Sequence, residues 1–322
     1  MLQLEALLLQ HPEGLTQADI ARRLGVNRST IYRYLPGLPG HIYIDDTDNN
    51  KLKIDRSAYL VNVRFNLNEA MAIHLATRLL ASTINEHNSH AAAALRKLAI
   101  SMKRLAPHIS DHMSESADQM DDISRKRSND FIKVLETLTL AWANGKKTKI
   151  FHRYRESGEV YEYMFSPYFI EPYAAGHSIH AIGLSKSLKG EEKIRTFKIE
   201  RIVRVKITNE CYQIPESFNP YDLMEDAWGI WYTMKKPVKV TLKFSTRVSA
   251  RVRATCWHQS QVLSNQTDGT LIWEGSIAEP KEMQPWIRGW GADCEVLTPE
   301  NLRQEMKSEA AKLFQVYKLG GE

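Results

Sequence analysis

The sequence has few cysteines and no long apolar run. Its three cysteines, Cys211, Cys256 and Cys294, lie tens of residues apart, which excludes a paired disulfide framework and a Cys-x-x-Cys zinc site. We therefore expect each cysteine to be a small buried residue in a reducing compartment. No stretch of about 18 apolar residues occurs, and the first residues lack the basic and apolar regions of a signal peptide. These absences predict a cytoplasmic protein with no membrane partner.

Signatures of catalysis are also absent. The sequence contains no Gly-x-Ser-x-Gly elbow, phosphate-binding loop, His-Glu-x-x-His helix or kinase signature. The pairs His108/His112 and His87/His90 have metal-like spacing, but no third ligand is evident, and solvated histidines are commoner than metal ligands. We expect no enzyme activity, no catalytic residue, no metal and no cofactor.

The charge of the chain is unevenly distributed. The 322 residues, of which 43% are hydrophobic and 25% charged, suffice for two or three domains, and the net charge is +5. Residues 1–65 carry 8 basic and 7 acidic side chains, whereas residues 146–207 carry 13 and 7. The surplus therefore belongs to one segment, which predicts an anionic partner there.

The N-terminal residues predict two crossed helices joined by a tight turn. One periodic run follows the N-cap candidate Thr16 and ends at Gly25, which can adopt the positive φ that the turn needs. A second run starts at Asn27 and stops at Pro36. Two strand-like runs within residues 42–54 follow, as in the wing of a winged helix.

The second helix of this pair is the candidate DNA-reading element. Its polar side chains would donate to phosphates and base edges when its N-terminal end enters a major groove. Because the segment is nearly neutral, and Lys and Arg supply most non-specific affinity, we expect a homodimer that doubles the contacts with double-stranded operator DNA. The expected DNA-binding residues are Thr16, Gln17, Asn27, Arg28, Ser29, Thr30, Tyr32, Arg33 and Lys51. The alternative is that these helices only pack against the rest of the protein.

The middle of the chain changes from helical to strand-like periodicity. Apolar spacing predicts helices at residues 66–81, 90–105 and 124–142. Pro107 would end the second of them, and the polar stretch 110–122 would be a loop or hinge. Alternation then predicts strands at residues 150–155, 161–165, 169–172, 179–184 and 199–208. Several short strands in about sixty residues predict a small, strongly bent barrel.

The C-terminal part predicts a mixed α and β region. Residues 238–244 alternate as a strand, and helices are expected at residues 246–256 and 299–317. The basic cluster Arg247, Arg251 and Arg253 would either extend a nucleic-acid surface or form a solvated helix face.

The sequence resembles the WYL-domain transcriptional regulators, most tellingly through the run Arg195-Thr196-Phe197-Lys198-Ile199-Glu200-Arg201-Ile202. The resemblance covers nearly the whole chain, and its C-terminal extension matches through Trp257-His258, Asp268-Gly269 and the run from Trp286 to Pro299. One departure is Ile179-His180-Ala181, where the family carries Trp-Tyr-Leu.

The resemblance implies an α+β fold with five segments along the chain. They are a winged helix-turn-helix (1–62), a helical linker (63–145), a Sm-like or SH3-like WYL β-barrel that senses a ligand (146–212), a second linker (213–236) and a small α+β WCX dimerisation domain (237–322).

The resemblance also implies that the barrel binds a nucleic-acid fragment, such as single-stranded DNA, or a nucleotide-like anion. The residues that match its basic site are Arg195 and Arg201, with Tyr154 on the first strand and His180 in place of the family tyrosine. Two arginines on neighbouring strands would give planar phosphate donors, aromatic rings would stack bases, and His180 would make affinity depend on pH near neutrality. His152 would share the face of Tyr154, as a pocket residue or a core histidine. The expected effector site is His152, Tyr154, Ser166, His180, Arg195, Phe197 and Arg201.

The sequence thus predicts a regulator in which effector binding to the barrel moves the two winged helices through the helical linker and changes operator affinity. The family context implies phage defence or a DNA-damage response. Three alternatives stay open. For the site, Arg195 and Arg201 would pair with Glu191, Glu192 and Glu200 on a solvated surface. For the protein as a whole, it would bind nucleic acid constitutively, or it would process nucleic acid in a phage-defence system.

Overall fold

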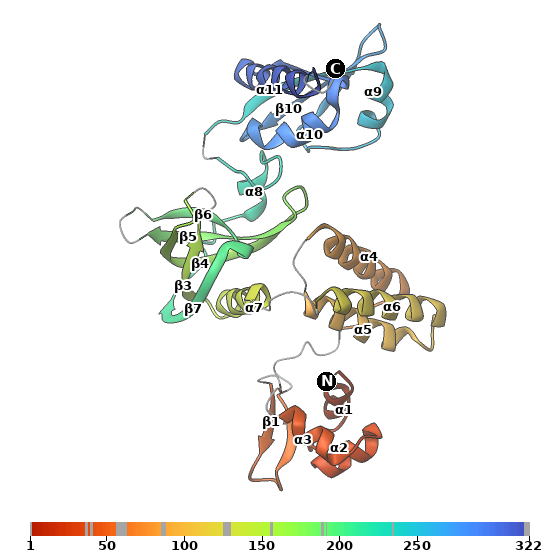
Figure 1. Ribbon diagram of the computed structural model, residues 1–322. Coiled ribbons are helices and arrows are strands. Elements are labelled where there is room, and N and C mark those ends of the chain that lie inside the picture. Colours follow the sequence, from red (N-terminus) through yellow and green to blue (C-terminus); the bar gives the residue numbers. More distant parts are fainter. Residues whose placement is uncertain are drawn as a thin grey trace. The chain divides into compact units, whose positions relative to one another are not determined.

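The computed structural model describes residues 2–35, 38, 41–55, 63–84, 88–124, 130–154, 157–187, 190, 192–233 and 235–318. The chain divides into two compact units (Figure 1), one made of Met1–Leu79 and Asn88–Lys126, the other of Leu80–His87 and Arg127–Glu322. Among the described residues, no helix is both long and apolar enough to cross a membrane. The mixed α and β class predicted from the sequence is confirmed.

The N-terminal part of the first unit is a three-helix fold with a two-stranded wing. Its elements are α1 (Leu2–Gln10), α2 (Gln17–Leu24), α3 (Arg28–Tyr34) and the antiparallel strands β1 (Ile42–Asp45) and β2 (Lys51–Ile54). Thr16 caps α2 by accepting the Asp19 N–H at 3.2 Å, and Gly25 ends it at φ 67. Leu8, Ile20 and Leu52 are fully buried in the core. The predicted cap, turn and wing are confirmed.

The rest of the first unit is helical, with α5 (Ser89–Met102), α6 (Pro107–Ser124) and most of α4 (Leu67–Thr83), whose residues from Leu80 onward belong to the second unit. The predicted loop or hinge at residues 110–122 is wrong, because this stretch lies within α6. Proline is tolerated at the first position of a helix, so Pro107 starts α6 as well as following α5. Ser110, Met113, Ala117 and Met120 are buried with helical spacing, and the Ser110 hydroxyl donates to the Ala99 carbonyl of α5 at 2.7 Å. The sequence analysis missed this helix because the segment is mostly polar and its buried face is made of small and flexible residues.

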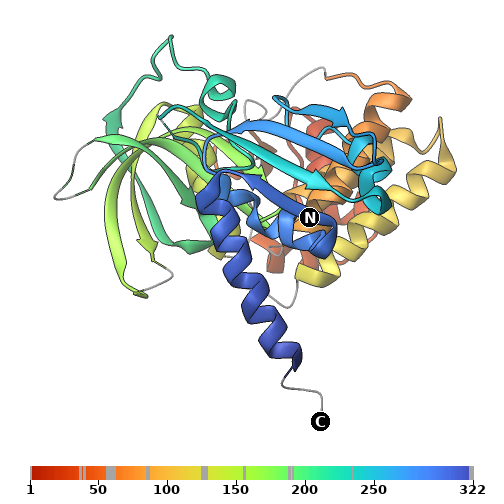
Figure 2. The same ribbon diagram turned by 90° about the horizontal axis from the view of Figure 1, so that it is seen from above.

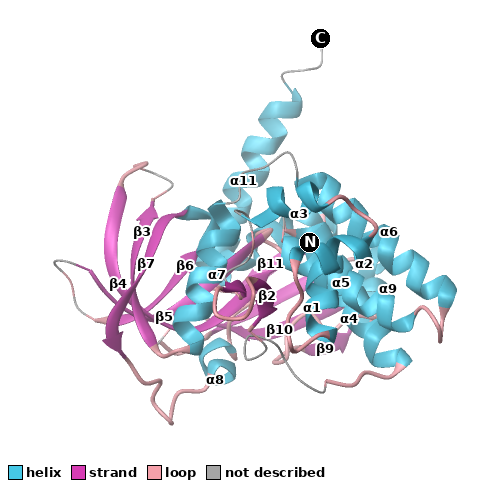
Figure 3. Cartoon of the chain, turned by 90° about the horizontal axis from the view of Figure 1, so that it is seen from below, coloured by secondary structure: helices cyan, strands magenta, loops and turns pink. Residues whose placement is uncertain are grey.

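The second unit contains a five-stranded antiparallel sheet, named here the central sheet. Its strands are β3 (Lys146–Arg153), β4 (Val160–Tyr173), β5 (Ser178–Ser187), β6 (Lys193–Lys198) and β7 (Ile202–Cys211), in the order β6-β5-β4-β3-β7. Figure 3 shows them as one curved sheet with α7 (Asp130–Ala143) beside it. Phe131 and Leu138 of α7 share a buried cluster with Phe165 and Phe197 of the sheet.

The central sheet differs from the predicted strands in three places, one of which is β6, for which no strand was predicted. The runs expected at 161–165 and 169–172 form one strand, β4, with an irregular register between Pro167 and Phe169. Residues 199–201, expected in a strand, form the short 3-10 turn η3 before β7. At the bend, a Cβ on Gly183 would lie 2.0 Å from the Ser166 carbonyl oxygen, so only glycine allows β4 and β5 to approach this closely.

The C-terminal domain of this unit is a four-stranded antiparallel sheet with helices. Its elements are β8 (Val238–Phe244), α9 (Thr246–Arg253), β9 (Val262–Asn265), β10 (Leu271–Ile277), η4 (Pro280–Met283), α10 (Gln284–Gly289), η5 (Gly291–Asp293), β11 (Cys294–Thr298) and α11 (Glu300–Lys318), with α8 (Pro220–Met224) before them. The strand order is β11-β8-β10-β9. Trp273 is fully buried in its core, and α11 projects beyond the sheet in dark blue (Figure 2).

The cysteines only partly follow the sequence prediction. Cys211 and Cys256 are exposed, so the expectation that every cysteine is buried is wrong for these two. Cys294 lies partly buried beside the C-terminal core, and burial raises the pKa of its thiol to about 12. All three are free thiols, and the lack of disulfides matches the predicted absence of a disulfide framework.

The C-terminal domain depends on Trp273, so Trp273→Ala should destabilise it strongly. The indole is fully buried and donates to Gln261 Oε1 at 3.1 Å, and truncation would leave a cavity and remove one of the two hydrogen bonds that this oxygen accepts. We expect a loss of about 3–5 kcal/mol in the free energy of unfolding, measured by urea denaturation. Tyr221→Ala, at a side chain that is 85% exposed, is the control and should change stability little. Equal stability of the two variants would contradict this assignment.

Candidate nucleic-acid interfaces

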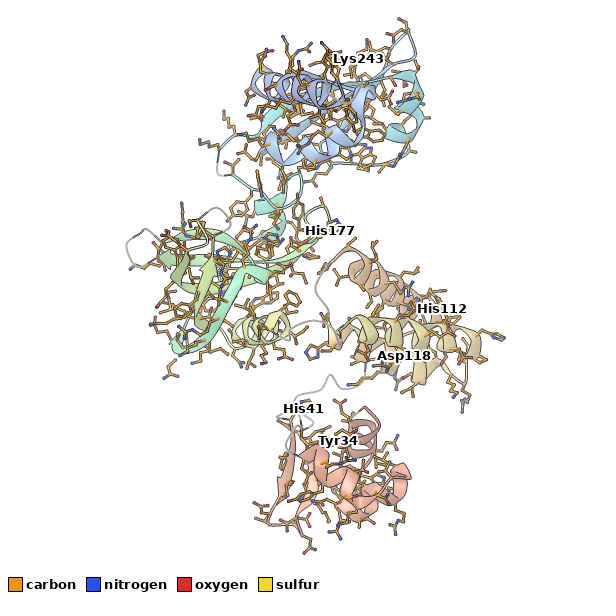
Figure 4. The ribbon with its side chains drawn as sticks, viewed as in Figure 1. Tyr34, His41, His112, Asp118, His177 and Lys243 are labelled. Carbon is orange, nitrogen blue, oxygen red and sulfur yellow. The ribbon has the colours of Figure 1, made fainter. Side chains whose placement is uncertain are left out.

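The helix α3 presents a polar face with two unpaired arginines. Ile31 anchors the helix in the core, while Arg28, Tyr32 and Arg33 are exposed. Neither arginine forms an ion pair with a residue that the structure describes. The expected contacts Asn27 and Ser29 are exposed on the same short segment, and Thr30 is half-buried. Tyr34, at the end of α3, is labelled in Figure 4.

The other expected DNA-binding residues are engaged within the fold. The Thr16 hydroxyl caps α2 and also donates to the Asp19 carboxylate at 2.6 Å, and Gln17 beside it is half-buried. In the wing, Lys51 Nζ lies 3.0 Å from Asp48, and Lys53 Nζ lies 2.8 Å from Asp45. The bond with Lys53 lowers the pKa of Asp45 to about 2, so these pairs stay charged at neutral pH. The wing therefore neutralises its own cations, and α3 carries the free positive charge.

The arginines of α9 are held by neighbouring side chains. Arg247 forms an ion pair with Asp293, the Arg251 guanidinium lies 5.1 Å from the centre of the Trp290 ring, and Arg253 donates to Asn265 at 2.6 Å. These contacts favour the reading of α9 as a solvated helix face.

A cavity of about 640 Å³ opens on the central sheet and gathers most of the expected effector residues. Its wall includes His152 and Tyr154 from β3 and the turn after it, His180 from β5, Arg195 and Phe197 from β6, and Arg201 from η3. Ser166 is the exception: it is buried on β4 and does not line the cavity. Residues that the sequence did not single out for this site also line it, namely Tyr173, Gly176, Ser178, Thr196, Lys198, Ile230 and Trp231.

Three half-buried cations face this cavity without a carboxylate partner. Arg195, Lys198 and Arg201 form no ion pair with any residue in the described part of the chain. Arg201 lies on η3 and not on a strand, which corrects the expectation of two arginines on neighbouring strands. Glu200, an expected partner, instead accepts the Ile179 N–H at 3.0 Å. Arg195 lies over the Tyr163 ring at 5.6 Å, and its buried Nε has no hydrogen-bond partner.

Two histidines, one buried and one half-buried, complete the polar wall. His152 is 7% exposed, and neither of its ring nitrogens has a hydrogen-bond partner. His180 Nε2 bonds the Ser178 hydroxyl at 2.9 Å, while Nδ1 has no partner. Burial, and after it the nearby Arg201, lowers the pKa of His152 to about 4. Burial, followed by Lys198 and Arg201, lowers the pKa of His180 to about 4 as well.

The predicted dependence of effector affinity on pH stays a prediction, because these pKa values are those of the protein alone. In the protein alone, both rings are neutral at pH 7 and sit beside three cations. Buried polar atoms normally have partners, so unbonded ring nitrogens in a cavity wall favour a polar ligand. His152 lines the cavity and its ring nitrogens have no hydrogen-bond partner, which favours a pocket residue over a satisfied core histidine.

A second cavity, of about 430 Å³, adjoins the first. The two share Tyr154 and Arg201, and the second adds Arg153 together with Phe131 of α7. Arg201 therefore stands between two hollows on one face of the sheet.

The histidine pairs considered as metal ligands gain no support. His108 and His112 both lie on α6, where the His112 ring makes an edge contact with His74 at 5.3 Å. His87 lies outside the described residues. Within the described ranges, no group of three or more His, Cys, Asp or Glu side chains is arranged to hold a metal ion.

Comparison with known proteins matches the two ends of the chain to domain families. Residues 4–43 match the IclR helix-turn-helix domain, and residues 236–314 match the WCX domain. Comparison with curated proteins gives no match.

Two solved structures are similar at low identity. Proteasome accessory factor B/C (PafBC) of Arthrobacter aurescens has 16% identity and a TM-score of 0.32, covering 95% of this chain and 47% of that one. This chain therefore spans about half the length of that protein. A crystal structure of a CRISPR Cas-related protein has 11% identity and a TM-score of 0.42, and the match covers 82% of this chain and 89% of that one.

The domain matches agree with the order of segments derived from the sequence and the fold. The helix-turn-helix match covers α1 to α3 and reaches β1, and the WCX match covers β8 through most of α11. The chain therefore combines an N-terminal helix-turn-helix DNA-binding domain of the IclR type with a C-terminal WCX domain.

Proposed function

We propose that this protein is a homodimeric transcription regulator that binds operator DNA through α3 and a nucleic-acid-like anion through the cavity of the central sheet. The observation that carries the second part is the set of Arg195, Lys198 and Arg201, three half-buried cations around one cavity without a carboxylate partner among the described residues. Burying such charges is costly unless an anion pairs with them.

The shape of the site favours an oligonucleotide as the effector. Successive phosphate groups of an oligonucleotide need donors at intervals along its backbone. Arg201 lines both cavities, Arg195 lines the cavity of about 640 Å³, and Arg153 lines that of about 430 Å³. Arginine donates to phosphate in a planar, bidentate way. Tyr154, 43% exposed at the boundary of both cavities, offers an aromatic surface for a base.

The β4–β5 turn offers a route from the cavity to the helical segment. Tyr173, Gly176 and Ser178 line the cavity, and His177 between them bonds the Thr83 carbonyl at the end of α4 through Nδ1. His177 is labelled in Figure 4, and its φ of 48 shows a tightly specified turn. We propose that effector binding shifts this turn and so biases α4, which gives a coupling free energy between effector and operator.

The homodimer rests on the WCX domain and on an apolar surface of α11. Leu313, Phe314, Val316 and Tyr317 are all more than half exposed near its C-terminal end. Two copies would double the modest positive charge that α3 offers to DNA.

Removing the unpaired arginines of α3 should weaken operator binding. Each of Arg28→Ala and Arg33→Ala should reduce affinity about 5- to 150-fold, because each removes a phosphate or base contact. The probe is a duplex selected from a random library by the full-length protein, and the salt dependence of binding should become shallower. Arg22→Ala is the control, since Arg22 already pairs with Asp19 at 2.6 Å. Undiminished binding by the α3 variants would rule out this helix as the reading element.

The double variant Arg195→Ala/Arg201→Ala should lose the effector. With a labelled single-stranded oligodeoxynucleotide as the probe, we expect a loss of at least about 100-fold, since each charge-assisted contact contributes about 1.5–3 kcal/mol. Any nucleic acid that co-purifies with the protein should disappear in the variant. The control is Arg204→Ala, because Arg204 stacks on Phe151 at 4.0 Å and does not line either cavity. Unchanged binding in the double variant would refute the cavity assignment, and operator affinity insensitive to the bound oligonucleotide would favour a constitutive nucleic-acid-binding protein.

Effector affinity should rise as the pH falls below neutrality. The pKa of His180 is about 4 in the protein alone, and a bound phosphate would raise it because an opposite charge favours the protonated ring. The complex then binds more protons than the free protein, so affinity rises as the pH falls. Affinity does not change with pH where His180 is neutral in both the free protein and the complex. Titrations between pH 8 and pH 5 measure this, and His180→Asn should flatten the slope. A decrease of affinity in acid would contradict the expectation.

A further inference from the structure

The segment 229–231 closes one side of the large cavity, although it lies in the linker between the central sheet and the WCX domain. Ile230 and Trp231 both line the cavity. Ile230 is 2% exposed and packs into a cluster with Tyr168, Phe169 and Ile182 of the central sheet. Trp231, the next residue, is 50% exposed. Ile230 thus fixes the segment to the central sheet, and Trp231 places an indole ring in the cavity wall.

A buried carboxylate of the WCX domain holds this segment. Glu282, on η4, is 5% exposed and accepts hydrogen bonds from the backbone N–H groups of three successive residues. Gly229 donates to Oε2 at 2.9 Å, Ile230 to Oε1 at 2.7 Å, and Trp231 to both oxygens at 3.2 Å. Bonds to a charged acceptor are stronger than neutral ones, so Glu282 fixes the backbone beneath Trp231.

The segment also fits tightly against the cavity wall. A Cβ on Gly229 would lie 2.3 Å from Cε2 of Tyr173 and 3.1 Å from Glu282 Oε1. The ring of Tyr173 itself lines the cavity and makes an edge contact with the His180 ring at 6.0 Å between centroids. Only glycine at position 229 permits this packing, which leaves the backbone little freedom to shift.

Trp231 differs from its neighbouring tryptophans. Trp228, Trp257, Trp273, Trp286 and Trp290 pack against one another in the C-terminal core. Trp231 makes no ring contact with any residue that the structure describes, is half exposed and lines a cationic cavity. An unstacked indole beside phosphate donors is suited to a flat aromatic ring that carries phosphate.

We infer that Trp231 stacks on a nucleobase of the effector and that Glu282 is the positioning residue that holds Trp231 in place. This inference deepens the proposed function and rests on it. Arg195 and Arg201 would bind the phosphates, which every nucleic acid has, whereas Trp231 would recognise that bases are present. The effector pocket would then be completed by the WCX domain, because the carboxylate that shapes its wall belongs to that domain.

The test compares trithymidylate with an abasic trinucleotide that has the same phosphates, each titrated against the full-length dimer. Trp231→Ala should lower affinity for trithymidylate about 5- to 100-fold, the range for losing one base–aromatic stack, and leave the abasic affinity unchanged. Trp231→Phe keeps an aromatic face and should retain most of the preference for bases. Because Trp231 is half exposed, these variants should fold.

Glu282→Gln should produce the same selective loss, smaller in size, and Gly229→Ala should do so through steric displacement. If Glu282 acts through Trp231, the double variant Trp231→Ala/Glu282→Gln should bind trithymidylate no more weakly than Trp231→Ala alone. Glu279→Gln, three residues before Glu282, is the matched control and should leave both affinities unchanged.

The outcomes separate this inference from the function on which it rests. Equal losses for both ligands in Trp231→Ala, or no loss for either, overturn the stacking role while leaving the phosphate site intact. Additive losses in the double variant overturn the positioning role of Glu282. A wild-type protein that binds neither trinucleotide overturns both the proposed effector and this inference.

Discussion

The molecule is organised around positive charge that its own carboxylates do not neutralise. Arg195, Lys198 and Arg201 are half-buried around one cavity, and within the described residues no acidic side chain pairs with them. The same field depresses the pKa of His152 and His180, whose burial is the larger cause, so the histidines stay neutral and add no further repulsion. This arrangement tolerates the charges only because the cavity remains open to water or to an anion.

In the winged helix, by contrast, carboxylates pair with the lysines of the wing. Asp45 and Asp48 bind Lys53, each at 2.8 Å, and Asp48 also binds Lys51. These pairs stiffen the wing but weaken its attraction for phosphate, whereas Arg28 and Arg33 of α3 form no ion pair with a described residue. In the proposed regulator, this small positive charge would keep non-specific DNA affinity low, so a modest change in the placement of α3 would have a large relative effect on operator occupancy.

Local chemistry explains how far the sequence predicted the structure. The Thr16 cap, the Gly25 turn and the strand at 238–244 follow from short-range rules and appear as predicted. The helix α6 was missed because its buried stripe, Ser110, Met113, Ala117 and Met120, contains only two large apolar residues in a segment that is otherwise mostly polar. Arg195 and Arg201 were found from the family motif. Trp231 was not, because segment 229–231 has no periodicity, and its position depends on Glu282 some fifty residues later in the chain.

The cavity is bounded by elements that lead toward different parts of the protein. The β4–β5 turn carries Tyr173, Gly176 and Ser178 into the cavity and bonds the end of α4 through His177. Segment 229–231 carries Trp231 into the same cavity and bonds the WCX domain through Glu282. Tyr173 belongs to the first element and packs directly against Gly229 of the second. A ligand that moves either wall must therefore also strain the other, because their contact is too close to absorb a shift. In the proposed regulator, one binding event would then bias both α4 and the WCX domain.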